Sequence, residues 1–184
     1  MVTWPDHLLT LAEWEAMPED RLHRYELVEG VLLVAPRPAS LHQYAMARLA
    51  TELDRRLPRD LVAVPDVEVL IDAGFPPTVR APDVVVVPTA VLEQNPPRFD
   101  AAEVLLAVEI ASPGSARTDR VMKVAEYADA GIGHYWIIDL APPVSLTGYL
   151  LVDDDYELMI ESAGVVEVTS PAALRLELGA LTRR

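Results

Sequence analysis

Two carboxylate residues stand inside runs of apolar residues, where an ionised group is least expected. Asp83 follows Pro82 and opens the run Val84–Val87, and Glu109 lies near the end of the run Leu105–Ala111. Short runs rich in β-branched residues predict buried strands. An unpaired polar group costs about 2–7 kcal/mol to bury, and a charge costs more. Each carboxylate therefore needs a compensating partner, and a divalent cation is one natural candidate.

Lys123 is the only lysine among the 15 basic residues (Lys plus Arg) of the chain. An ammonium is a compact point charge on a flexible stem, whereas a guanidinium is a planar fork, so the two are not interchangeable. In a chain that otherwise uses arginine, this lysine indicates a specific role. The alternative is an exposed helical ion pair with Asp119, four residues earlier, which would contribute about 0.3–0.5 kcal/mol.

The elements that precede these residues are predicted by turn and cap signals. Thr10 and Glu13 have the spacing of a capping box for a short helix. Apolar segments on either side of Glu29-Gly30 predict a β-hairpin with glycine in the turn. Ser40 is expected to cap a helix over residues 40–57, whose leucines recur at helical spacing.

The elements that follow alternate between strands and one helix. Strands are expected near residues 61–64 and 67–71, and another at 135–139. A helix is expected from about Thr118 to Ala130, with Gly131 as its C-terminal cap. Further antiparallel strands are expected near residues 145–152, 156–161 and 165–169. The fold class is thus α/β (α+β): a mixed central sheet flanked by one long helix on each side, in a single domain over residues 1–184.

Composition excludes several function classes. A hydrophobic fraction of 51% predicts a packed core, and the absence of cysteine excludes disulfides, thiolate metal sites and a cysteine nucleophile. No apolar run approaches the roughly 20 residues that span a bilayer, and a cytoplasmic protein without membrane contact is expected. The net charge of −14 argues against binding nucleic acid through bulk charge. A nucleic-acid enzyme with this charge would need local arginine clusters and bound cations.

Several short blocks follow one another in a fixed order along the chain. They are Arg24-Tyr25-Glu26-Leu27-Val28-Glu29-Gly30, His42-Gln43, Pro82-Asp83-Val84-Val85-Val86, Val108-Glu109-Ile110-Ala111-Ser112-Pro113, Asp119 with Lys123 and Tyr127, Gly131-Ile132, and His134-Tyr135-Trp136-Ile137. Their types and order resemble the Uma-two family of restriction endonucleases, within the PD-(D/E)XK nuclease superfamily. The resemblance extends from about Leu11 to Asp139, with a motif-bearing core at about residues 24–139, and implies a restriction-endonuclease-like fold.

One position departs from the plain superfamily pattern. The lysine of Glu-x-Lys would stand at Ala111, and alanine cannot supply its charge. The resemblance implies that this lysine has moved to the following helix, at Lys123. It also implies that Asp83, Glu109 and the backbone carbonyl of Ile110 hold Mg²⁺ or Mn²⁺, and that Lys123 orients a water or stabilises negative charge.

Other residues of the blocks are weaker candidates. Glu26 is expected to supply a further carboxylate from the hairpin, unless it is only a solvated hairpin residue. His42 would contact phosphate or a carboxylate, although a locally bonded helix-start histidine is the simpler interpretation. Ser112 and Asp119 are expected to cap and orient the helix of Lys123. Tyr127 is most simply a core aromatic. The alternative for Asp83 is a carboxylate that bonds only to loop amides. The alternative for Glu109 is a position on an exposed sheet face.

Three functions remain open at the level of sequence. The first is a Mg²⁺-dependent endonuclease that hydrolyses DNA through a local site, as a homodimer if both strands are cut. The second is a catalytically inactive binding or assembly protein that retains the nuclease fold, which the acidic charge favours. The third is a metal-dependent enzyme acting on a smaller phosphoester. Divalent-cation binding separates the second from the others, and the choice of substrate separates the first from the third.

Overall fold

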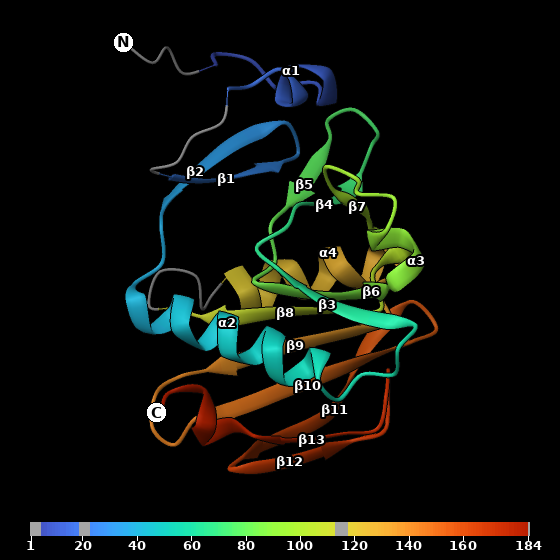
Figure 1. Ribbon diagram of the computed structural model, residues 1–184. Helices are drawn as coiled ribbons and strands as arrows, with labels where there is room; N and C mark the ends of the chain where they lie inside the picture. The colour runs from blue at the N-terminus through green and yellow to red at the C-terminus, as the bar shows by residue number, and fades with distance from the viewer. Residues whose placement is uncertain (1–4, 19–22, 113–117, 184) are drawn as a thin grey trace.

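The computed structural model describes residues 5–18, 23–112 and 118–183. Its largest element is a six-stranded sheet (Figure 1). The strand order is β11 (Asp155–Ala163), β10 (Ser145–Val152), β9 (His134–Asp139), β8 (Leu106–Ala111), β6 (Val84–Pro88) and β3 (Leu61–Pro65). Strands β8 and β9 are parallel, and the other pairs are antiparallel. The expected mixed central sheet is confirmed.

The parallel pair β8–β9 needs a crossover connection, because a tight turn joins only antiparallel strands. The described part of this crossover consists of a π-helical turn, η2 (Thr118–Met122), and the helix α4 (Lys123–Asp129). Gly131 ends α4 with φ of +77°, and the amide of Ile132 donates to the carbonyl of Tyr127. This is the Schellman arrangement that a glycine after a helix predicts. Lys123 therefore lies at the first position of α4.

A second, five-stranded sheet packs above the first (Figure 1). Its order is β2 (Val31–Pro36), β1 (His23–Val28), β5 (Thr78–Arg80), β4 (Val69–Asp72) and β7 (Phe99–Asp100). The expected hairpin β1–β2 is confirmed, and Glu29 and Gly30 both have positive φ, as a type I′ turn requires. The sequence predicted one central sheet with additional antiparallel strands. It did not predict this second sheet, to which the hairpin and β4 belong.

The helix ends follow local hydrogen bonding. The helix α1 (Leu11–Glu15) has the expected capping box, in which Thr10 and Glu13 bond reciprocally. The helix α2 (Ser40–Asp54) begins one residue earlier than a cap at Ser40 predicts, because the N-cap residue is Ala39 and no side chain caps it. The sequence signal at Ser40 was wrong in this respect. A short helix, α3 (Thr89–Leu92), which the sequence did not predict, follows β6.

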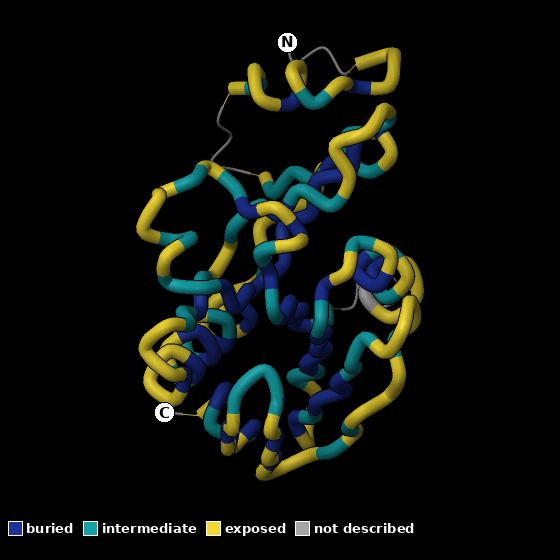
Figure 2. Tube along the Cα trace, turned by 90° about the vertical axis from the view of Figure 1, so that its right-hand side faces the viewer, coloured by how far each residue is buried: buried dark blue, intermediate teal, exposed yellow. Residues whose placement is uncertain are grey.

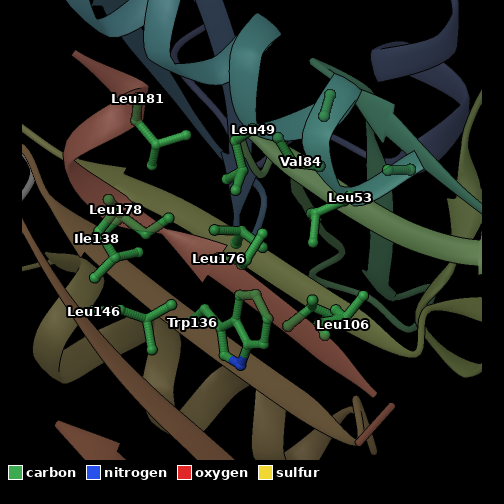
Figure 3. Packing of buried hydrophobic residues seen from close by; sticks show 14 of the residues in the cluster. Leu49, Leu53, Val84, Leu106, Trp136, Ile138, Leu146, Leu176, Leu178 and Leu181 are labelled. Carbon is green, nitrogen blue, oxygen red and sulfur yellow. The ribbon is translucent and has the colours of Figure 1, made fainter. Parts of the chain in front are cut away.

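Both faces of the six-stranded sheet are covered. On one face, the α2-side core joins Leu49 and Leu53 of α2 to Trp136 of β9 and to Leu176 of the hairpin β12 (Val165–Val168)–β13 (Leu174–Glu177). Figure 3 shows the indole ring of Trp136 among these leucines. A final 3₁₀ turn, η3 (Leu178–Leu181), packs against α2 in the same core.

On the other face, the α4-side core joins Tyr127 of α4 to Tyr135 of β9 and Ala107 of β8. The run Val84–Val87 contributes to both cores, with alternate residues on each side, and all four are fully buried. Figure 2 shows buried residues along the strands and exposed residues on the outer turns. None of the described helices is long and apolar enough to cross a membrane.

Candidate active site

The register of β6 and β8 brings the two sequence-selected carboxylates together. Val84 pairs with Val108, so Asp83 and Glu109 stand one residue beyond this pair, opposite each other. Side chains alternate along strands, which places both carboxylates on the α4 side of the sheet. Directly opposed residues have Cβ atoms about 4.5–5.5 Å apart. Asp83 is 1% exposed and Glu109 is 4% exposed, which excludes an exposed sheet face for Glu109.

Asp83 is held by three donors from three elements. Its Oδ1 accepts from Nη1 of Arg24 at 2.7 Å, and its Oδ2 accepts from the amide of Ile110 at 2.7 Å. Nε2 of His42 lies 3.2 Å from the same Oδ2. Burial alone would raise the pKa of Asp83, but the hydrogen bond of His42 and the charge of Arg24 lower it below its usual value. Asp83 is therefore an ionised, cation-paired carboxylate.

Glu109 is held by two donors from α4. Its Oε1 accepts from Nζ of Lys123 at 2.7 Å and from the hydroxyl of Tyr127 at 3.0 Å. Burial and the charge of Glu109 raise the pKa of Tyr127 well above its usual value, so the hydroxyl keeps its proton and donates. Lys123 is only 5% exposed. Burial excludes the interpretation of Lys123 as an exposed helical ion pair.

Glu26 connects this lysine to the five-stranded sheet. Nζ of Lys123 donates to Oε1 of Glu26 at 3.1 Å, and Nη1 of Arg80 donates to Oε2 at 2.8 Å. Arg80 is fully buried and also donates to both carboxylate oxygens of Glu126, at 2.6 and 2.7 Å. Burial would raise the pKa of Glu26, but the charges of Lys123 and Arg80 lower it. Glu26 is thus a paired carboxylate and not a solvated hairpin residue.

A cavity of about 1030 Å³ opens onto these groups. Among its lining residues are Arg24, Glu26, His42, Asp83, Glu109, Ile110, Ser112 and Lys123. The residues come from both sheets and from the helices α2 and α4, so the site lies at the seam between the sheets (Figure 1). Sequence positions 59 to 97 residues apart meet here, as in the pairs Arg24–Asp83 and Glu26–Lys123.

Several sequence candidates occupy different places around this cavity. Tyr127 lies behind Glu109, is fully buried, and belongs to the α4-side core as expected. Ser112 lies after β8 and lines the cavity. The helical segment that it was expected to cap begins directly after residues that lie outside the described range, so this role remains a prediction. The side chain of Asp119 lies outside the described residues, so its role remains a prediction.

Sequence reasoning missed three charged residues of the site: Arg24, Arg80 and Glu126. Arg24 had a usable signal, because it stands two residues before Glu26 in one strand and so faces the same side. Arg80 had none, since it lies in a strand of only three residues. The permanent cations Arg24, Arg80 and Lys123 lie among the carboxylates Glu26, Asp83, Glu109 and Glu126 and offset most of their negative charge.

Two of the expected metal ligands, Asp83 and the carbonyl of Ile110, present oxygen atoms toward one place. Nε2 of His42 lies 2.9 Å from the carbonyl oxygen of Ile110 and 3.2 Å from Oδ2 of Asp83, so these two oxygens converge on one point. Within residues 5–18, 23–112 and 118–183, no group of three or more His, Asp or Glu side chains forms a metal cage. Two carboxylates and a carbonyl fit Mg²⁺, which keeps several waters and binds through one or two carboxylates.

The contacts of His42 predict that the metal-free protein becomes less stable at alkaline pH. Burial would lower the pKa of His42, but its bonds and attraction to Asp83 raise the pKa above 6.5. Its contribution to stability is therefore full below that pH and is lost as the pH rises through the higher folded pKa. The titration of Asp83 affects stability only at acidic pH, because its pKa is lowered below 3.8.

We therefore expect the free energy of unfolding in EDTA to decrease as the pH rises above 6.5, and to decrease less in His42→Gln. Urea unfolding at several pH values measures this. A variant with an unchanged pH slope would show that the slope comes from other groups.

Comparison with known proteins identifies the family to which the chain belongs. A search of the curated proteins finds no match. A solved structure, described as "a putative nuclease belonging to DUF820" from Anabaena variabilis, is similar over 95% of this chain and 97% of its own, with a TM-score of 0.74 and 22% identity. This likeness shows the fold. The model of the Uma2 family, described as "Putative restriction endonuclease", matches residues 11–182, and the chain therefore belongs to this family.

Proposed function

We propose that this protein is a Mg²⁺-dependent endonuclease that hydrolyses phosphodiester bonds of DNA. The observation that carries the proposal is the 2.7 Å contact between Nζ of Lys123 and Glu109. A lysine from α4 thereby stands beside the strand carboxylate, although Ala111 occupies the usual lysine position. Asp83 lies opposite Glu109 on the neighbouring strand, at the wall of the same cavity.

Each residue has a defined task in this proposal. Asp83, Glu109 and the carbonyl of Ile110 would hold the cation. To bind it, Asp83 would give up its contacts with Arg24 and His42. The bound cation would polarise the phosphate and lower the pKa of a water. Glu26 and Glu109 fix the ammonium of Lys123 from two sides, at 3.1 and 2.7 Å. A charge fixed in this way stabilises developing negative charge without reorganisation.

Tyr127 and Arg80 support these groups from behind. The hydroxyl of Tyr127 donates to the same oxygen of Glu109 as Lys123 does, which limits rotation of the carboxylate. Arg80 fixes Glu26 and is itself anchored by two bonds to Glu126. The position of the lysine is therefore set by buried ion pairs and not by a flexible stem alone.

Two alternative functions use the same fold and the same groups. A binding or assembly protein without catalysis is favoured by the net charge of −14 and by the cation pairing of both carboxylates. A small-phosphoester enzyme would use the same groups. The protein would act as a homodimer if it cuts both strands of a duplex.

The test is cleavage of supercoiled plasmid DNA, with bis(p-nitrophenyl) phosphate and single-stranded RNA as competing substrates. We expect DNA nicking with Mg²⁺ or Mn²⁺ and none in EDTA, and Asp83→Asn serves as the control for contaminating nucleases. Hydrolysis of only the small diester would favour the third function. Metal binding without hydrolysis of any substrate would favour the binding protein.

A further inference from the structure

The segment that contains α2 has a positive net charge in this acidic chain. Of its arginines, Arg48 lies within α2, and the others lie just before or just after the helix. Residues 37–59 contain five arginines and two carboxylates, a net charge of +3, whereas the chain as a whole carries −14. The remaining residues therefore carry −17. A local excess of arginine against such a background is a specific feature of the surface, since it cannot follow from overall composition.

One face of α2 carries a groove of about 220 Å³, here called the α2 groove. Its lining includes Tyr44, Arg48, Thr51 and Arg55, which recur at spacings of four, three and four residues and so lie on one helix face. Ala47 leaves room between them. The side chain of Arg55 is 70% exposed and Tyr44 is 37% exposed, so both are accessible to a ligand.

The charge of the α2 groove is positive despite one carboxylate. Glu52 also lines it, but Glu52 contacts two arginines, Arg55 at 3.5 Å and Arg56 on the next turn. Arg48 places its guanidinium 5.9 Å from the ring centroid of Tyr44 and has no ion pair with a carboxylate of the described residues. Its Nε is buried and has no hydrogen-bond partner in the described part of the chain.

The α2 groove leads toward the active-site cavity. Arg37 and Leu41 line the cavity, and Tyr44 begins the groove one helical turn later. From Leu41 to Arg55 the helix extends about 21 Å, at 1.5 Å per residue. This length corresponds to about six base pairs of duplex, at 3.4 Å each.

We propose that the α2 groove binds the sugar-phosphate backbone of the nucleic acid whose scissile bond lies in the cavity. The guanidinium fork matches phosphate oxygens, and Tyr44 offers a ring for a sugar or base. The position of the groove on the same helix as the cavity-lining Leu41, one turn further along, favours nucleic acid over an acidic protein as the occupant. The inference rests on the proposed function for the identity of the ligand, and it deepens that function by assigning the track along which the substrate lies.

The test measures binding without cleavage. A fluorescein-labelled 20-base-pair DNA duplex is titrated in Ca²⁺, and fluorescence anisotropy is recorded over a series of salt concentrations. Each lost phosphate contact lowers the slope of log K against log salt by about 0.9. We expect this loss in Arg48→Gln and in Arg55→Gln, which corresponds to about eightfold weaker binding at 0.1 M salt.

The matched control is Arg175→Gln. Arg175 has the same charge and a side chain 68% exposed, and it lies on β13, outside both the cavity and the α2 groove. Its variant should keep the wild-type slope. Arg48→Lys retains the charge and should keep most of the affinity, which separates lost charge from lost packing against Tyr44. Arg55 is exposed, so Arg55→Gln should fold normally.

The proposal is overturned if the Arg48 and Arg55 variants keep the wild-type salt slope. It is also overturned if Arg175→Gln lowers this slope as much as they do. It is also overturned if polyglutamate competes as well as unlabelled DNA at equal charge, which would indicate an acidic-protein surface. Failure of the nuclease proposal has a different signature: wild type would show the arginine-dependent slope in Ca²⁺ but would cleave no DNA in Mg²⁺.

Discussion

Replacing Asp83 by Asn is expected to abolish the rise in melting temperature that Mn²⁺ gives to the wild-type protein. A ligand at 100 times its dissociation constant stabilises by about 2.7 kcal/mol. For a chain of this size, that corresponds to a rise of about 5–10 °C. Asn keeps the shape of Asp83 but offers only a neutral oxygen, so the rise should vanish together with DNA cleavage. Glu109→Gln should behave in the same way.

The metal-free variant should also be less stable than the wild type. From sequence, two converging carboxylates would repel, and removing one charge would leave stability unchanged or higher. The structure reverses this expectation, because Arg24 pairs with Asp83 at 2.7 Å. In the variant, the guanidinium of Arg24 would lose this charged partner. Breaking a buried pair costs about 3–5 kcal/mol, and less here because the side chain of Arg24 is 19% exposed.

Asp66→Asn is the matched control for this experiment. Asp66 also contacts Arg24, at 3.7 Å, but its side chain is 48% exposed and does not line the cavity. Its variant should keep the Mn²⁺ response and lose little stability. Thermal unfolding in EDTA and in millimolar Mn²⁺ supplies both readings. If Mn²⁺ does not raise the melting temperature of the wild-type protein, the proposed metal site is wrong.

Lys123→Arg is expected to lower the rate of cleavage by about 10²–10³-fold while leaving metal affinity nearly unchanged. The ammonium occupies one point, within 3.1 Å of Glu26 and 2.7 Å of Glu109. A guanidinium spreads its charge over a planar fork and cannot place one nitrogen there. The carboxylates that would hold the metal are untouched, and the net charge is conserved.

The control exchange is Arg120→Lys, three residues earlier, where the side chain is 41% exposed and contacts Asp139. It should leave cleavage within about twofold, since exposed ion pairs contribute under ~1 kcal/mol. Steady-state cleavage and a Mn²⁺ titration of the same preparations measure the two effects. The buried arginine also adds volume, so a melting curve must show that the Lys123 variant is folded. An arginine variant as active as the wild type would remove Lys123 from the mechanism.

The sequence predicts those parts of the site whose signals are local. Asp83 and Glu109 interrupt apolar runs, and the alternation of Val84–Val87 between two cores explains why such runs indicate a strand buried on both faces. The Glu29-Gly30 turn is predicted correctly because a type I′ turn needs two residues with positive φ. Lys123 is the only lysine in a chain whose other basic residues are arginines, and this composition already indicates a specific role.

What the sequence does not predict depends on pairing between distant segments. Within the second sheet, the hairpin is joined to the other strands through β5. The pair Leu27–Val79 links β1 to this strand of three residues. A segment this short has no measurable periodicity. Arg80 lies in it, so its bonds to Glu26 and Glu126, and the charge balance that they complete, become visible only in three dimensions.

The position of the site at the seam between two sheets has a consequence for synthesis on the ribosome. Arg24 and Glu26 emerge early, whereas Glu109, Lys123 and Glu126 emerge only about 100 residues later, as the separation of 97 residues between Glu26 and Lys123 shows. No nascent fragment that ends before Glu126 contains the complete network of charges. The carboxylates, their cations and the wall of the cavity are thus assembled together, late in translation, and an interrupted chain carries no finished site.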